Sequence, residues 1–461
     1  MSRGTFIDLC YLVAAVGFIV ALKALGSPRR ARAGNLIAAA GMVLAIGVTF
    51  ARPGLGHIPL IVVAMVLGVV IGVPSARLVK MTAMPQMVAA FNGVGGGAAA
   101  VVSITQFIGG DTKTLATYKV LEVVFGVLVG SVSFSGSVLA FAKLQELMTG
   151  RPVTYPAQQP LNAVLGGAIV GLVVAIAVTS STPLLWILLG LSLVLGAIFV
   201  LPIGGADVPV LISLLNSFTG LAVAASGFAL NSNLLIVAGT LVGASGMLLT
   251  RMMSAAMGRS LPNILFSAFG SVVTATGETG GTEGRSVRAS TPEDVAVLLA
   301  YSRKVMIVPG YGLAVAQAQH TVRELADALT ARGVEVFYAI HPVAGRMPGH
   351  MNVLLAEADV PYDELKEMDE ANPEMGSTDV ALVVGANDTV NPAAKTTPGS
   401  PIYGMPIINA DEASNVVFLK RSMRPGFAGI DNELLYSDKT VLLFGDAKDT
   451  LQKLVAAVAH A

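Results

Sequence analysis

A turn in the second half of the chain has the residues that could bind a phosphate. The apolar run Val305–Pro309 is followed by Gly310-Tyr311-Gly312 and, after Val315, by Ala316 at the start of a helical pattern. Glycines after a buried strand let backbone amides approach a pyrophosphate at a helix N-terminus. The third glycine of the dinucleotide fingerprint is absent here, because position 315 is valine. The turn indicates a dinucleotide site, and a simple glycine-rich connection stays open as the alternative.

Four later loops also follow strand-like runs, where a nucleotide at the strand ends would reach them. Their candidate residues are Val343, Ala344, Gly345, Arg346, Met347 and Pro348; Gly385, Ala386, Asn387, Asp388 and Thr389; Lys420, Arg421, Ser422, Met423, Arg424, Pro425, Gly426 and Phe427; and Asp446 with Ala447. The three basic residues of the third loop suit a dianionic 2′-phosphate, since Arg offers a bidentate fork and Lys a point charge. A solvated basic loop is the alternative, and Asp388 can instead close an Asx turn.

Strands and helices must alternate to position these loops. Apolar runs predict strands at 304–309, 334–340, 379–384, 415–420 and 440–445, with a weaker pattern at 405–409. Helical patterns cover 313–331, 351–359 and 447–460, and Thr291 before Pro292 predicts a helix start. Alternation of this kind predicts a parallel sheet with helices on both faces over residues 292–461. His341 and His350 have no cysteine or carboxylate at ligand spacing, so no metal site is predicted.

The first half of the chain has the composition of a membrane protein. Hydrophobic residues make up 54% of the sequence and charged residues only 13%, about half the usual share in soluble domains. Stretches long enough to cross a bilayer lie near 5–25, 34–52, 57–75, 84–108, 120–148, 160–179, 183–201, 207–228 and 233–257. We therefore expect a transmembrane domain over 1–260, a glycine-rich linker over 261–291 and a soluble domain over 292–461.

Charge separates the two halves and excludes several classes of protein. Residues 1–260 carry 14 Lys and Arg against 5 Asp and Glu, and residues 261–461 carry 15 against 24, so net charges of +9 and −9 cancel. This pattern excludes a disordered chain and a basic nucleic-acid binder. The single Cys10 cannot form an internal disulfide. No P-loop motif is present, so ATP-driven transport has no support.

Basic residues in the short loops predict the orientation of the membrane domain. Loops after odd-numbered helices hold Arg29, Arg30, Arg32, Arg77, Lys80, Lys143, Arg151, Arg251 and Arg259, and loops after even-numbered helices hold only Arg52, Lys113 and Lys119. The odd loops therefore face the cytoplasm. With nine spans, the N-terminus is expected outside and the acidic C-terminal half inside.

A few polar residues lie at membrane depth, where they are costly and are functional candidates. Asp207 and Glu122 begin the eighth and fifth spans, Asn216 lies within the eighth, and Asn92 lies within the fourth beside a Gly93–Gly97 pair. The alternative is structural: asparagines bond neighbouring helices, glycines allow close packing, and Asp207 caps a helix at the interface. His57 is the only histidine of this half, which argues against a histidine relay within this chain alone.

These motifs together resemble the beta subunit of the proton-translocating NAD(P) transhydrogenase over essentially the whole chain. The resemblance rests on Pro309–Gln317, Val343–Pro348, Gly385–Thr389, Gly404-Met405-Pro406, Lys420–Met423 and Gly445–Lys448 in the soluble half, and on Met84–Ala89, Gly204–Asp207 and Asn216 in the membrane half. It implies a polytopic α-helical membrane domain of nine transmembrane helices plus an α/β Rossmann-like parallel-sheet nucleotide domain.

The resemblance also implies roles for the loops. The five loops, with Gly404 and Met405, would bind NADP(H) in the reverse of the usual direction, and Lys420, Arg421 and Ser422 would hold the 2′-phosphate. Asp388 would lie near the nicotinamide, and its loop would transmit the proton signal. Asn216, Asp207 and Asn92 would belong to the proton pathway. NAD(H) would sit on an alpha subunit, made of one or two polypeptides, in a dimer of such assemblies in a bacterial-type inner membrane.

One position departs from part of that family. Some relatives have a histidine in the fourth span where this chain has Asn92, and a histidine on a membrane helix of the partner is expected to replace it. Hydride transfer between two nicotinamides needs no general acid or base, which agrees with the lack of a catalytic dyad in this sequence. Residues 277–290 are the expected route or hinge that links the two domains.

Two other functions remain open on the sequence. A channel or secondary transporter regulated by a cytosolic NADP-sensing domain would move substrate without hydride transfer. A potassium filter would place Gly-Tyr-Gly at membrane depth, whereas here it lies in the soluble half, which argues against that version. A membrane anchor that only holds nucleotide would bind it without moving protons.

Overall fold

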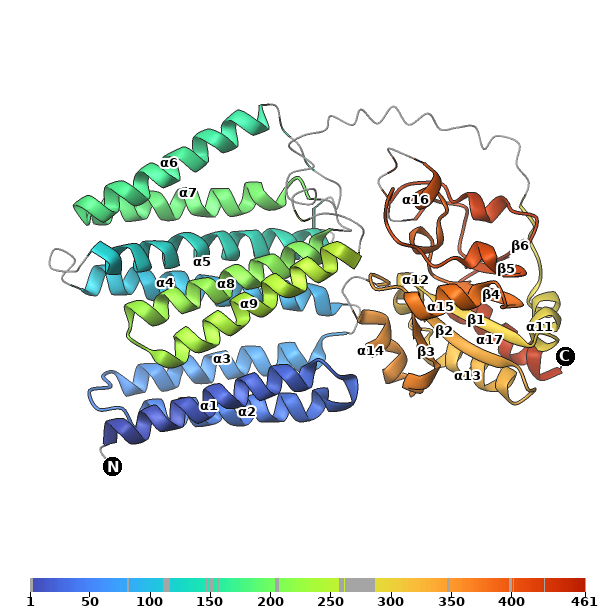
Figure 1. Ribbon diagram of the computed structural model, residues 1–461, viewed down its shortest axis with the longest axis horizontal. Helices are drawn as coiled ribbons and strands as arrows, with labels where there is room; N and C mark the ends of the chain where they lie inside the picture. Colours follow the sequence, from blue (N-terminus) through green and yellow to red (C-terminus); the bar gives the residue numbers. More distant parts are fainter. Residues whose placement is uncertain are drawn as a thin grey trace. The chain divides into compact units, whose positions relative to one another are not determined.

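The chain forms two compact units, Met1–Thr250 and Arg251–Ala461 (Figure 1). This computed structural model describes residues 3–460 except 81–82, 111–116, 146, 149–152, 154, 156, 204–206, 257–260, 262–286, 346–348, 398–399, 401 and 427. Most of the expected linker over 261–291 therefore lies outside the described residues.

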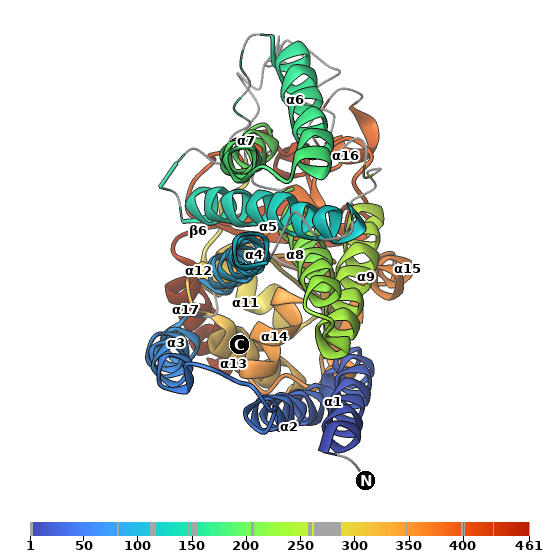
Figure 2. The ribbon, with the colours of Figure 1, turned by 90° about the vertical axis from the view of Figure 1, so that its left-hand side faces the viewer.

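Within the described residues, nine helices are long and apolar enough to cross a bilayer, as the sequence predicted. They are α1 (Arg3–Leu25), α2 (Pro28–Phe50), α3 (Ile58–Leu78), α4 (Met84–Gly109), α5 (Thr117–Leu144), α6 (Gln158–Thr179), α7 (Thr182–Val200), α8 (Val208–Ala229) and α9 (Asn233–Ala256). Figures 1 and 2 show α4, α5, α8 and α9 gathered together, and α1 and α2 side by side as a pair. The membrane unit is thus built around the helices that carry most of its polar residues.

Some helix ends differ from the prediction. Helix α2 begins at Pro28, six residues earlier than expected, because Ser27 is extended and proline suits the first helical position. Arg30 and Arg32 therefore lie in the first turns of a helix and not in a loop. Helix α5 ends at Leu144 instead of residue 148, so it is not as far extended as its apolar run suggested.

Glycines bring α4, α5, α8 and α9 into close contact. A Cβ at Gly130 of α5 would lie 2.7 Å from the Gly96 carbonyl of α4, and one at Gly220 of α8 would lie 2.4 Å from the Gly243 nitrogen of α9. Gly93 faces Ser137, also on α5. Such approaches exclude any side chain and allow backbone-to-backbone packing in a bilayer.

The C-terminal unit contains a six-stranded, wholly parallel sheet, which confirms the predicted fold class. Its strands are β1 (Lys304–Pro309), β2 (Glu335–Ile340), β3 (Leu365–Glu367), β4 (Val380–Val384), β5 (Asn415–Lys420) and β6 (Thr440–Phe444), in the order β3-β2-β1-β4-β5-β6. This is the strand order of dinucleotide-binding folds. The central strands are buried on both faces, so they read as continuous apolar runs.

Helices connect and cover these strands. They are α11 (Pro292–Ala300), α12 (Tyr311–Val315), α13 (Gln319–Thr330), α14 (His350–Glu357), α15 (Met368–Met375), α16 (Ala393–Thr396) and α17 (Ala447–His460). The connections β1-α13-β2 and β3-α15-β4 run in opposite directions along the sheet. Because parallel crossovers are right-handed, α13 and α15 cover opposite faces. The predicted helix start is present, since the Thr291 hydroxyl accepts a hydrogen bond from the Asp294 nitrogen at 3.2 Å.

Two expectations for this unit were wrong, and one strand was missed. The helix expected over 313–331 is split into α12 and α13, because Gln317 has a positive φ of 50° that a continuous helix cannot contain. Residues 405–409 form no strand. The third strand of the half-sheet is β3, which is only three residues long and reads Leu-Lys-Glu, so it gave no apolar signal.

An ion cluster ties β1, β3 and α15 together. Lys304 of β1 and Lys366 of β3 both donate to the Glu374 carboxylate of α15, and the Lys366 ammonium also lies 3.7 Å from the Phe337 ring centroid. Hydrogen bonds from Lys304 first, and then from Lys366, lower the pKa of Glu374. Protonating this carboxylate must therefore weaken the folded sheet.

We expect Glu374→Gln to lower the melting temperature of residues 287–461 at neutral pH by roughly 2–4 °C, the usual scale for a modest loss in a domain of this size. A carboxyl pKa lowered by folding stabilises above the unfolded pKa of about 4.3 and loses that effect as pH falls through the folded value. The difference between variant and parent should vanish in acid, measured by circular dichroism. Glu370→Gln, at an exposed position of α15, is the control and should change little. A deficit that persists at acid pH would contradict the carboxylate's role.

Candidate functional site

The order of the strands reverses between β1 and β4, so the chain leaves these two neighbouring strands in opposite directions along the sheet. In open parallel sheets, ligands bind at this point, outside the carboxyl ends of the strands. Gly310 begins the loop after β1, and Gly385 begins the loop after β4. The predicted dinucleotide turn thus lies at the expected place in the fold.

The two loops are in direct contact. The Gly310 nitrogen donates to the Val384 carbonyl at 2.9 Å, and the Gly312 nitrogen donates to the Gly385 carbonyl at 2.9 Å. A Cβ at Gly310 would lie 2.4 Å from the Ala386 Cα, and Gly385 has a positive φ of 70°. These glycines are needed for the loops to pack against each other. This role is separate from letting the backbone approach a phosphate.

The turn after Gly310 leads into α12, which has only five residues. Tyr311 begins this helix and its ring centroid lies 6.4 Å from that of His350, while Ala316 caps its C-terminal end. The long helix expected to begin here starts instead at Gln319. The amides of Gly310 and Gly312 are bonded to the loop after β4, so the glycines of this turn serve first to pack the two loops together.

The loop after β4 is held to the loop after β5 through Asp388. One carboxylate oxygen of Asp388 accepts from the Ala428 nitrogen at 2.8 Å, and the other accepts from the Asn387 amide at 3.2 Å. A Cβ at Gly426 would lie 2.4 Å from the Asp388 carboxylate. Thr389 is half-buried, and its carbonyl accepts from the Ile408 nitrogen. The carboxylate of Asp388 thus fixes the position of the glycine-containing part of the β5 loop.

Basic residues gather at the end of β5. The Lys420 ammonium donates to the Asn387 side-chain oxygen at 3.1 Å, so the ends of β4 and β5 are linked. Burial lowers the pKa of Lys420, and the carboxylates of Asp388 and Asp431 oppose that shift. Arg424 and Pro425 are exposed, and Arg424 donates to the Ser422 hydroxyl at 3.3 Å. The loop therefore presents cationic groups at the edge where a ligand binds.

The start of α17 joins the same group. Arg421, whose side chain is 59% exposed, lies 3.4 Å from the Asp446 carboxylate, which also accepts from the Lys448 nitrogen. Ala447 is buried as the first residue of α17, and Met423 packs against the core of the sheet. The ion pair of Arg421 with Asp446 thus links the loop after β5 to the loop after β6.

A buried histidine connects the loop after β2 to the segment that includes Gly404 and Met405. His341 Nδ1 accepts from the Val343 nitrogen at 3.2 Å, so its Nε2 carries the proton that is donated to the Pro406 carbonyl at 2.7 Å. Burial lowers the pKa of His341, which keeps the ring neutral at pH 7. The histidine is a structural tie, a role that its sequence position did not reveal.

The neighbouring residues of these segments are also placed. Ala344 is buried and its nitrogen donates to the His341 carbonyl, and Gly345 has a positive φ of 99° that brings it close to His350. The Gly404 nitrogen donates to the Ala394 carbonyl, and Met405 packs against Ile402 and its neighbours. The expected binding residues Arg346, Met347, Pro348 and Phe427 lie outside the described residues.

Two asparagines of the site were missed by the sequence analysis. Asn432 donates to the Asn387 carbonyl at 3.1 Å, and the buried Asn391 donates to the Asp431 carbonyl at 3.1 Å and accepts from the Ala393 nitrogen. Asn391 lies in the loop after β4 and Asn432 lies after β5, so together they tie these two loops to each other. No spacing or composition signal could have identified them, because their partners are backbone atoms.

In the membrane unit, Asn92 belongs to a polar network between α4, α5 and α8. Its amide donates to the Ser137 hydroxyl at 2.8 Å and lies 3.4 Å from that of Ser133. The Ser133 and Thr219 hydroxyls are 2.6 Å apart, and Ser133 donates to the Leu215 carbonyl. The two serines lie four residues apart on one face of α5, a spacing that could have identified them.

The hydrogen bonds that join Asn92, Ser133, Ser137 and Thr219 do not include the side chains of Asn216 and Asp207. Asn216 is half-buried on α8, and its side chain makes no hydrogen bond within the described part of the chain. Asp207 precedes Val208 at the start of α8, and its carbonyl accepts from the Leu211 nitrogen. The structure therefore brings Asn92 together with hydroxyl groups and leaves Asn216 available one turn from Thr219.

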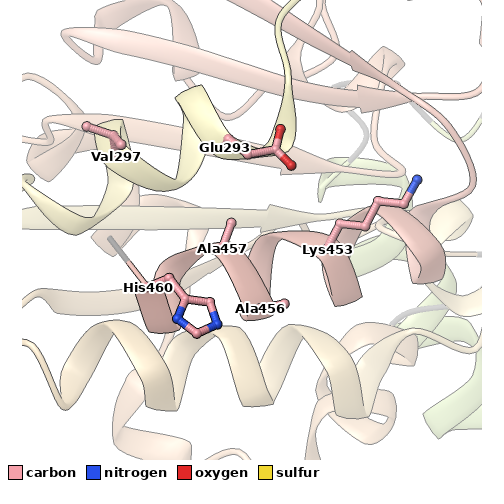
Figure 3. A pocket seen from close by; sticks show the side chains of 6 residues that line it. All are labelled: Glu293, Val297, Lys453, Ala456, Ala457 and His460. Atoms are coloured by element: carbon pink, nitrogen blue, oxygen red, sulfur yellow. The ribbon is translucent and has the colours of Figure 1, made fainter.

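A separate groove lies between α11 and α17 (Figure 3). Its lining residues are Glu293, Val297, Lys453, Ala456, Ala457 and His460. Helix α17 begins at Ala447, beside the candidate site, and ends at His460, which lines the groove. The groove therefore extends toward the edge of the sheet opposite the candidate site. None of the predicted binding residues lines it.

Comparison with known proteins gives consistent matches. Residues 7–457 match the family described as NAD(P) transhydrogenase beta subunit. The chain is 49% identical over 454 residues to the NAD(P) transhydrogenase subunit beta of Rhodospirillum rubrum, covering 97% of this chain and 98% of the relative. A second relative, from a named strain of that species, has the same name, identity and coverage.

We expect Gly310→Ala to destabilise the C-terminal unit by about 1–3 kcal/mol, the usual cost of forcing an extra methyl group into a packed region. The new Cβ would meet the Ala386 backbone, so the loops after β1 and β4 must separate. Thermal unfolding of residues 287–461 measures the loss. Gly376→Ala is the matched control, because nothing lies within 4 Å of its Cβ position. Equal stability of the two variants would show that the loops do not need this contact.

Proposed function

Because the chain belongs to the NAD(P) transhydrogenase beta subunit family, we propose that it binds NADP(H) on its C-terminal sheet and exchanges hydride with NAD(H) held by a partner alpha subunit. The exchange is coupled to inward proton translocation through its membrane unit. The observation that carries the proposal is the cationic loop after β5, joined by Lys420 and Asn387 to the loop at the sheet's reversal point.

The loops fit a phosphorylated dinucleotide. The glycine turn has no side chains at Gly310 and Gly312 that would block a phosphate, and Lys420, Arg421 and Arg424 offer charged donors beyond β5. A 2′-phosphate bound there puts the adenosine over the β4–β5–β6 half of the sheet, the reverse of the usual direction. We assign the 2′-phosphate to Lys420, Arg421 and Ser422, and the remaining loop residues to the rest of the nucleotide.

The chain's own part in the reaction is positioning. The nicotinamide supplies the hydride chemistry when it is bound, and the protein orients the ring and excludes water. Asp388 is placed to do this, because its carboxylate holds the β5 loop against the β4 loop. The neutral His341 keeps the Val343–Gly345 and Gly404–Met405 segments together on the other side of the site.

A second polypeptide must supply the other nucleotide. The described part of this chain has one dinucleotide-type sheet, and hydride transfer between two nicotinamides requires two. We assign NAD(H) to the alpha subunit and propose a dimer of alpha–beta assemblies. From the basic residues of the short loops we infer that the N-terminus lies outside a bacterial-type inner membrane and the C-terminal unit lies in the cytoplasm.

Coupling requires that protonation in the membrane changes the affinity for NADP(H), because coupling is a reciprocal difference between states. A proton crossing the membrane releases about 2.3 kcal/mol per 100 mV. We assign Asn92, Asn216 and Asp207 to the pathway, with the hydroxyls of Ser133, Ser137 and Thr219 as relays. Since an asparagine does not titrate, a histidine of the partner's membrane helix is expected to complete it.

Reconstitution with the alpha subunit in lipid vesicles tests the proposal as a whole. The measurement combines reduction of acetylpyridine adenine dinucleotide by NADPH with the internal pH of the vesicles. Hydride transfer accompanied by proton movement supports the proposal. Substrate flux without hydride transfer would favour a nucleotide-regulated transporter instead.

We expect Lys420→Ala and Arg421→Ala to weaken NADP+ binding, because each removes a charge-assisted contact of about 1.5–3 kcal/mol, or on the order of ten- to a hundredfold in Kd. The loss should be smaller for the exposed Arg421. Calorimetry with adenosine 2′-phosphate and adenosine 5′-phosphate separates the contacts, since only the first should be affected. Lys453→Ala on α17 is the control. Unchanged affinity for adenosine 2′-phosphate would reject this placement.

We expect Asn216→Leu to slow proton-coupled turnover while leaving NADP+ binding to the C-terminal unit intact, because the polar group removed lies in the membrane half. Vesicle proton uptake and NADP+ titration measure the two properties. Asn35→Leu, at an exposed position of α2, is the control. Wild-type pumping by Asn216→Leu would remove this residue from the proton pathway.

A further inference from the structure

A short segment at the start of the C-terminal unit adds to the edge of the sheet beside β6. Ala289 pairs with Leu442 of β6 in parallel. The Leu442 nitrogen donates to the Arg288 carbonyl at 2.8 Å, and the Ser290 nitrogen donates to the Leu442 carbonyl at 3.0 Å. We call residues 287–290 the edge segment. It covers the side of β6 that faces away from β5.

Two side chains hold the edge segment in addition to its backbone bonds. Val287 packs against the hydrophobic core of the sheet, and Met423 of the loop after β5 packs against the same core. The Arg288 guanidinium donates to the Asp438 carbonyl at 3.0 Å, just before β6 begins. The edge segment is therefore part of the packed sheet and not merely a connection to it.

The helix that follows the edge segment packs against the helix that follows β6. Val295 and Leu299 of α11 are buried, and so are Leu454 and Val458 of α17. The two helices lie side by side (Figure 3). Asp446 lies between the end of β6 and the start of α17. The edge segment and α11 thus hold both of the elements that flank Asp446.

Asp446 connects this edge of the sheet to the cationic loop. Its carboxylate lies 3.4 Å from the guanidinium of Arg421, whose side chain is largely exposed. Lys420 differs, because its ammonium is bonded to Asn387 at the end of β4. A long exposed side chain loses rotamer freedom when it binds a ligand, unless a neighbour has already oriented it. The orientation of Arg421 therefore depends on where β6 and α17 place Asp446.

We propose that the edge segment is a positioning element for the 2′-phosphate site: by holding β6, it places Asp446, which orients Arg421 toward the phosphate. This inference rests on the proposed function. A guanidinium has five donors, so Arg421 can keep its bond to Asp446 and still donate to a phosphate. The edge segment acts through Arg421 and makes no contact of its own with the nucleotide.

The test measures nucleotide binding to the full chain in detergent and compares Ser290→Pro with Ala289→Pro. Proline at 290 removes the N–H that donates to Leu442, whereas the N–H of Ala289 points away from β6, where an edge tolerates proline. We expect Ser290→Pro to raise the Kd for adenosine 2′-phosphate about three- to tenfold, within the range of couplings between contacting residues. The Kd for adenosine 5′-phosphate should not change, and Ala289→Pro should bind both nucleotides as the parent does. Calorimetry measures each Kd.

A double-mutant cycle with Arg421→Ala separates positioning from general damage to the sheet. If the edge segment acts through Arg421, Ser290→Pro should cause no further loss in the Arg421→Ala background. An unchanged Kd in Ser290→Pro, an equal loss for both nucleotides, or losses that multiply would overturn the inference. If Ser290→Pro does not fold, Val287→Ala, which removes packing from the same segment, takes its place in the cycle. A parent protein that binds adenosine 2′-phosphate no more tightly than adenosine 5′-phosphate would instead reject the proposed function.

Discussion

The contact between the loops after β1 and β4 is the constraint on which the site depends. At Gly310 and Gly385 the loops after β1 and β4 approach each other so closely that no side chain fits between them. This contact lies where the strand order of the sheet reverses. The close approach sets the path of Asn387 and Asp388. Asn387 then accepts a hydrogen bond from Lys420, and Asp388 accepts one from the Ala428 nitrogen. Both bonds fix the loop after β5 to the loop after β4. A short backbone contact thus determines where the cationic residues lie.

In the membrane unit, glycines likewise allow a close approach, here between helices instead of loops. Glycines bring α4, α5 and α8 close enough for Asn92, Ser133, Ser137 and Thr219 to bond one another. Close packing of this kind satisfies polar groups that lipid cannot. Small residues and polar residues are therefore parts of one arrangement, and the structural and functional interpretations of Asn92 do not exclude each other.

The sequence predicted elements that have a continuous local signal and missed those that depend on distant partners. The nine membrane helices and the buried strands β1, β2, β4, β5 and β6 were evident as apolar runs. The edge strand β3 was not, because its three residues are held by pairing with β2. The break at Gln317 and the tie made by His341 depend on neighbouring loops. The membrane network likewise requires a helix register that spacing alone does not give.

The groups of the proposed pathway differ in what they can do with a proton. Hydroxyls and amides, as in Ser133, Thr219 and Asn92, can pass a proton along or orient it but cannot hold a charge at neutral pH. A carboxylate such as Asp207 can hold one. The position of that carboxylate therefore matters more than its presence, since a relay conducts only to an acceptor within hydrogen-bond reach.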